Sequence, residues 1–104
     1  MAKRKPSERR RQSRAQADLV QDLERLAKRA PGGSPGRPID VEAPTQVEPI
    51  AEGTACPLCE GGLRLVEHAA ETHGGTRLRV AHMRCTSCGI GRALFFRLAA
   101  TSLN

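Results

Sequence analysis

Apolar residues between positions 13 and 30 recur at spacings of three and four. The stripe consists of Ala15, Leu19, Leu23, Leu26 and Ala30. This spacing is typical of one face of an amphipathic helix, and Pro31 with the two glycines after it would end that helix. We predict a helix over residues 13–30, whose stripe either packs against the rest of the chain or docks on a partner.

The second half of the chain shows strand-like segments instead. Residues 63–68, 76–84 and 91–98 are rich in apolar and alternating positions, and residues 71–75 contain turn-forming glycines. After Val80 the apolar phase of the middle segment shifts by one residue, which predicts a bulge or a strong twist near the cysteines. We therefore expect a three-stranded antiparallel sheet within residues 54–104.

Two other segments lack a folding pattern. Residues 1–12 contain no apolar residue beyond Met1 and Ala2, so we expect a disordered basic arm. Residues 31–53 contain five prolines with Gly, Ser and acidic residues, a composition that favours a flexible acidic linker. The predicted order is arm, helix, linker and a small β domain.

Composition limits the size of any core. The chain has 104 residues, no Trp or Tyr and only two Phe, and a core with so few aromatic rings is small. No apolar run approaches the length of a membrane span, and no apolar stretch follows the basic N-terminus as it would in a secretory signal. We expect a cytoplasmic protein, in which cysteines stay reduced and point to a metal or to catalysis rather than to disulfides.

Positive charge is concentrated at the N-terminus. The chain has a net charge of +6, and its first 14 residues hold seven cationic side chains against Glu8. The cationic residues are Lys3, Arg4, Lys5, Arg9, Arg10, Arg11 and Arg14. Such a cluster favours contacts with nucleic-acid phosphates, although it is also compatible with a solubility tail.

Four cysteines form two Cys-x-x-Cys pairs separated by 25 residues. They are Cys56, Cys59, Cys85 and Cys88. Tight turns of this spacing aim four thiolates at one point, which predicts a closed, structural Zn²⁺ site. Iron, a redox dithiol or disulfides are the alternatives. Because four sulfurs fill the coordination shell, we expect His68, His73 and His82 to be surface residues, and Arg84 and Arg92 are candidates to offset the negative charge of the site.

These features resemble the zinc-ribbon superfamily, the rubredoxin-like Cys₄ fold of transcription factors, RNA polymerase subunits and ribosomal proteins. The resemblance covers residues 54–98 and rests on the CPLC and CTSCG sequences with the strand-like segments. It implies a three-stranded antiparallel sheet with two zinc knuckles. Transcript-cleavage factors of this kind carry adjacent acidic residues at the hairpin tip, whereas Glu71 is followed here by Thr72 and His73.

The sequence thus predicts a binding protein rather than an enzyme. The leading hypothesis is a zinc-ribbon protein that binds nucleic acid, in transcription or on ribosomal RNA, through nonspecific phosphate contacts of the basic arm. The alternative is an interaction module that docks on a larger protein complex through its helix or its ribbon face. We expect neither a membrane nor a small-molecule substrate as a partner.

Overall fold

The computed structural model describes residues 6–99, with side chains from residue 10 onward. It begins with helix α1, Pro6–Arg29, which starts seven residues before the predicted Ser13. The disorder predicted for residues 1–12 is therefore wrong for residues 6–12, and residues 1–5 lie outside the described range. Pro suits the first helical position, and Arg, Gln and Glu favour helix even without an apolar face.

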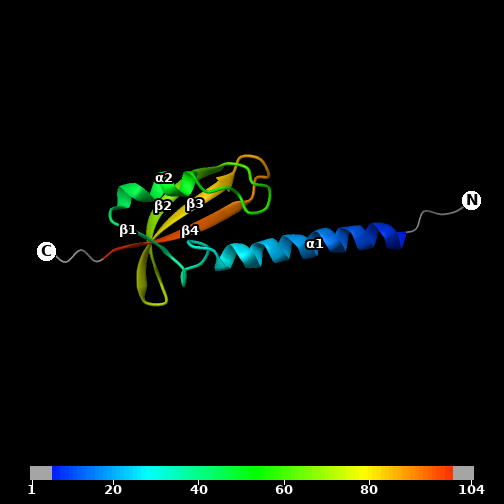
Figure 1. The fold of residues 1–104 in the computed structure, drawn as a ribbon, viewed down its shortest axis with the longest axis horizontal. Coiled ribbons are helices and arrows are strands. Elements are labelled where there is room, and N and C mark those ends of the chain that lie inside the picture. The colour runs from blue at the N-terminus through cyan, green and yellow to red at the C-terminus, as the bar shows by residue number, and fades with distance from the viewer. Residues whose placement is uncertain (1–5, 100–104) are drawn as a thin grey trace, which may run out of the picture.

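The β domain is a four-stranded mixed sheet (Figure 1). Its strands lie in the order β1 (Ile39–Val41), β4 (Gly91–Leu98), β3 (Thr76–Cys85) and β2 (Leu63–His73). The β2–β3 and β3–β4 pairs are antiparallel, as predicted. The prediction of three strands is wrong, because β1 adds a fourth strand parallel to β4.

The segment predicted as a flexible linker supplies part of the core. After β1 it forms the short 3₁₀ helix η1 (Pro44–Gln46) and the helix α2 (Val47–Glu52). The side chains of Val41, Val47 and Ala51 are buried, and α2 packs against β2 and β3 on one face of the sheet (Figure 1). A sheet buries an apolar face only against another layer, and here residues 31–53 provide that layer.

The phase shift after Val80 has a different cause from the predicted bulge. Leu78 and Val80 are buried on one face of β3, and Ala81 and Met83 are buried on the other. Both faces of this central strand are covered, so its apolar residues run consecutively. The irregularity in the pairing lies instead in β2, between Leu65 and Glu67.

Helix α1 contacts the β domain only through its C-terminal half. Its half-buried residues are Leu23, Glu24 and Ala27, and every other residue from 10 to 29 is exposed. Leu19 and Leu26 of the predicted apolar stripe are 58% and 61% exposed. The helix therefore projects from the domain along most of its length (Figure 1).

Two connections fix the C-terminal end of α1 to the sheet. Glu24 Oε2 lies 2.9 Å from Arg92 Nη2, on β4. Beyond the helix, the Phe95 N–H donates to the Gly32 carbonyl at 2.8 Å, which ties the turn to β4. Among residues 6–99, no helix has the length and apolar character needed to cross a membrane.

Candidate metal centre

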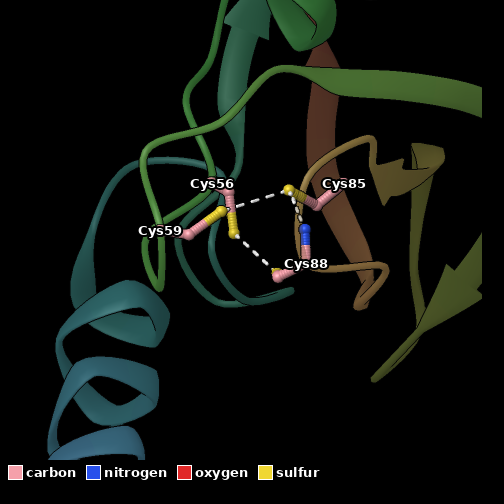
Figure 2. A group of neighbouring side chains, drawn as sticks. All are labelled: Cys56, Cys59, Cys85 and Cys88. Atoms are coloured by element: carbon pink, nitrogen blue, oxygen red, sulfur yellow. Dashed lines mark hydrogen bonds between the residues drawn. The ribbon is translucent and has the colours of Figure 1, made fainter.

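The four cysteines converge from two loops at one end of the sheet (Figure 2). Their Sγ atoms all lie within 4.8 Å of one another. The Cys56–Cys88 and Cys59–Cys85 Sγ pairs are 3.8 and 3.4 Å apart. A tetrahedral ZnS₄ centre with bonds of ~2.3 Å has S–S edges of about 3.8 Å, so the sulfurs fit such a centre. These separations are too long for a disulfide bond of ~2.05 Å.

Each cysteine pair sits in a turn of the same design. In the first, the Glu60 N–H donates to the Cys56 carbonyl at 2.7 Å; in the second, the Gly89 N–H donates to the Cys85 carbonyl at 3.0 Å. The residue after the second cysteine has a positive φ in both turns, 65° at Glu60 and 79° at Gly89. Glycine adopts this conformation readily, whereas Glu does so at a cost.

The two turns pack closely on each other at Gly61. A Cβ on this residue would lie 2.5 Å from Ser87 Oγ and 3.2 Å from Cys59 Sγ. The Thr86 N–H also donates to the Gly62 carbonyl at 2.9 Å. Gly61 is therefore needed for the close approach of the turns, while the positive φ belongs to Glu60.

Backbone N–H groups point at the sulfurs and favour their thiolate form. The N–H groups of Ser87 and Cys88 lie 3.3 and 3.4 Å from Cys85 Sγ. The N–H donated by Cys88 is the largest cause of a lowered pKa for Cys85, to about 6. For Cys59, the Gly61 N–H lowers the pKa, but sharing a proton with Cys85 and partial desolvation outweigh it and raise the pKa to about 12.

The Cys₄ cluster lies partly in the apolar core and partly at the surface. Cys56 and Cys85 are buried and belong to the same apolar cluster as Val47, Met83 and Phe96, whereas Cys59 and Cys88 are exposed. A metal held by all four would therefore link both turns to the packed face of the sheet. Because four protein ligands leave no open position, such a site is structural in kind.

The three histidines lie away from the sulfur cluster. Glu71 Oε1 and Oε2 are 2.9 and 2.6 Å from the Nε2 atoms of His73 and His82, and these hydrogen bonds, that of His82 foremost, lower the pKa of Glu71. The prediction of surface positions is wrong for His68, whose side chain is only 14% exposed and lies near Glu48 of α2.

The Glu71 contacts also indicate that the end of the β2–β3 hairpin is bent. Glu71 pairs with Leu78 across the hairpin, four residues along β3 from His82. A side-chain contact over that distance requires the end of the hairpin to fold across β3. His73 meets Phe95 of β4 edge-to-face, with ring centroids 5.3 Å apart, which places the same end over β4.

The two arginines beside the second turn have different partners. Arg84 Nη1 donates to the Gly89 carbonyl at 3.0 Å, so it supports the turn through its backbone. Arg92 binds Glu24 of α1 and connects the helix to the first residues of β4. Sequence reasoning did not identify this link, because nothing local relates positions 24 and 92.

The predicted nucleic-acid-binding residues are only partly described by the structure. Arg10, Arg11 and Arg14 lie on α1 and are exposed. Arg9 is part of the same helix, but its side chain is outside the described part of the structure. Lys3, Arg4 and Lys5 lie outside the described residues. The arginines that can be placed are therefore on helix α1 and not on a disordered arm.

The geometry of the site is that of a Cys₄ cluster suited to one metal ion. The cluster lies in a small mixed α/β domain with a projecting helix. Comparison with known proteins gives no match: no family model fits the sequence, and no curated protein or solved structure is significantly similar to it.

Proposed function

We propose that this chain is a small cytoplasmic zinc-ribbon protein that binds nucleic acid, in transcription or on ribosomal RNA, and has no catalytic role. The observation that carries the proposal is the projecting helix α1, which presents Arg10, Arg11 and Arg14 to solvent beside a domain closed by the Cys₄ cluster. The metal stabilises the domain, and the helix with its basic N-terminus contacts phosphates.

Zinc is the metal that best suits this donor set. Four thiolates at tetrahedral spacing are typical of structural Zn²⁺ sites, and such sites supply folding energy directly. A folded unit of this size with two aromatic residues has a core worth only about 3–5 kcal/mol. The need for a metal therefore follows from the size of the core as well as from the cysteines.

Phosphate binding is supported by where the charge lies. Residues 1–14 carry a net charge of +6, and residues 10–14 of this segment are solvent-exposed helix. Residues 53–104 carry six Arg against three Glu, and four thiolates with Zn²⁺ reduce that surplus of three to about one. Electrostatic attraction to phosphates is therefore centred on the N-terminal segment.

The test is nucleic-acid binding measured by fluorescence anisotropy over a salt series. If residues 1–14 neutralise about four to six phosphates, they contribute about −4 to −5 to the slope of log K against log salt. Deleting residues 1–14 should remove most of the affinity and flatten the slope. A matched control, Arg64→Gln with Arg77→Gln, removes two exposed charges from the sheet and should change little. Absence of binding by the intact protein at low salt contradicts the proposal.

Docking on a larger protein is the second candidate, and one observation favours it. Leu19 and Leu26 lie on the same side of α1 and are more than half exposed, an arrangement typical of helices that dock in a groove. In that case Leu19→Ser with Leu26→Ser would abolish association with the complex and leave nucleic-acid binding unchanged. Retention of a protein partner after nuclease treatment separates the two functions.

A further inference from the structure

We propose that α1 binds double-stranded nucleic acid as a single rod, with cationic residues near both of its ends in contact with phosphates. This inference rests on the proposed function and deepens it in two ways. It names a duplex as the ligand, and it adds a second set of contacts, Arg25, Lys28 and Arg29, that lies outside the basic segment 1–14.

The described part of α1 has two clusters of positive charge. The N-terminal cluster consists of Arg10, Arg11 and Arg14, and the C-terminal cluster consists of Arg25, Lys28 and Arg29. All six residues are exposed. Successive residues are about 100° apart around a helix, so each of the six lies at least about 100° from Ala27.

Ala27 lies on the side of α1 that faces the β domain. Ala27 is half-buried, as are Leu23 and Glu24 on neighbouring parts of the helix surface, and Glu24 binds Arg92 of β4. Arg11, Arg14, Arg25 and Arg29 therefore lie on the side of α1 opposite Ala27, and Arg10 and Lys28 lie at the edge of that side. This outer face is exposed to solvent from Arg10 to Arg29.

The order of charges along the outer face favours a ligand with two rows of phosphates. Asp18 and Asp22 lie between the clusters, and Asp22 also binds Arg25 at 2.8 Å. The cluster centres are about 23 Å apart at 1.5 Å per residue. The major groove of B-form DNA is about 12 Å wide, so a helix of this reach crosses it and meets the backbones on both sides. The aspartates then face the groove, between the phosphate rows.

The body of the protein holds α1 in place for such a contact. Gly33 packs directly on the helix, where a Cβ would clash with the Ala27 carbonyl oxygen. The Gly32 carbonyl accepts the Phe95 N–H, and the Arg92 side chain that binds Glu24 is only 11% exposed. The C-terminal half of α1, which is anchored in this way, loses little additional freedom when it binds.

Phosphate binding should stabilise the outer half of α1. Residues 10–22 are exposed on all sides, and a helix of that length is marginal by itself. Like charges four residues apart, as at Arg10 and Arg14, destabilise it further. Phosphates relieve this repulsion, so duplex binding should slow amide hydrogen exchange across residues 10–22.

The experiment compares the full-length zinc-loaded protein with the triple variant Arg25→Gln, Lys28→Gln and Arg29→Gln. The probes are 20-base-pair DNA and RNA duplexes and a single strand of equal length. Their binding is measured by fluorescence anisotropy over a salt series. We expect the duplex salt slope to become shallower by about two to three, with an affinity loss of at least about tenfold at low salt. The Arg64→Gln, Arg77→Gln protein is the control, and circular dichroism confirms that α1 remains helical in the triple variant.

The outcomes distinguish this inference from the proposed function. An unchanged slope in the triple variant, with binding lost on deletion of residues 1–14, overturns the rod and leaves the proposed function standing. Equal or tighter binding of the single strand also overturns it. No binding of any nucleic acid overturns both. Tighter binding to anionic phospholipid vesicles than to either duplex overturns both in favour of a membrane surface. The RNA duplex, whose major groove is deep and narrow, should bind more weakly than the DNA duplex, and tighter binding to RNA overturns the groove contact.

Discussion

At the scale of single residues, the sequence predicts the clustering of the cysteines. It predicts only part of the backbone conformation of the turns that hold them. Two Cys-x-x-Cys pairs are local patterns, and the sulfurs do cluster as the spacing predicts. The residue with a positive φ in the first turn is Glu60, a residue type that by itself does not indicate this conformation. Aligning the two turns would have shown this, because Glu60 and Gly89 both directly follow the second cysteine of their pair.

Glu60→Gly should stabilise the protein. Glu60 is exposed and has a φ of 65°, a conformation that costs a non-glycine residue about 1–2 kcal/mol. Glycine removes this cost but adds freedom to the unfolded chain. The net gain in the free energy of unfolding should be about 0.5–1 kcal/mol, measured by urea denaturation of the zinc-loaded protein.

Gly89→Ala is the matched control in the second turn. A Cβ at Gly89 meets no atom within 4 Å, so any loss arises from its φ of 79° and not from a clash. We expect destabilisation by about 1 kcal/mol. If both variants leave the unfolding free energy unchanged, positive φ does not limit the stability of either turn.

At the scale of elements, helices and strands with strong periodicity are predictable and the short elements between them are not. The strands at 76–85 and 91–98 were recognised from their own residues. The elements β1 and α2 are three and six residues long and lie among prolines, so they show no period. They form because Val41, Val47 and Ala51 fill the uncovered face of the sheet, which is a tertiary effect.

Val47→Ala tests whether this segment is part of the fold. Val47 is 0% exposed, and deleting its methyl groups should lower the free energy of unfolding by about 2 kcal/mol through lost burial and a small cavity. Ile50→Ala, on the same helix at 38% exposure, should cost less than half as much. Equal effects of the two substitutions in thermal or urea unfolding would mean that α2 does not pack on the sheet.

At the scale of the whole molecule, a small domain with a Cys₄ cluster carries a helix that makes few contacts with it. The periodicity of residues 13–30 predicts a helix separate from the strands, but it does not predict how the two are held together. The Glu24–Arg92 pair spans 68 positions, and no local pattern predicts contacts over such a separation. We expect the domain to depend on a metal at the Cys₄ cluster, since a structural zinc would contribute on the order of 10–16 kcal/mol against the few that so small a core provides.

The most direct test of this account is the metal content of the purified protein, measured by elemental analysis after expression without added metal. The expected result is one zinc per chain. Cys85→Ser should bind none and lose its dispersed amide signals between residues 39 and 98, because the protein no longer has the fourth thiolate. Iron in place of zinc, no metal in freshly reduced protein, or a folded sheet in the Cys85→Ser variant would contradict the account.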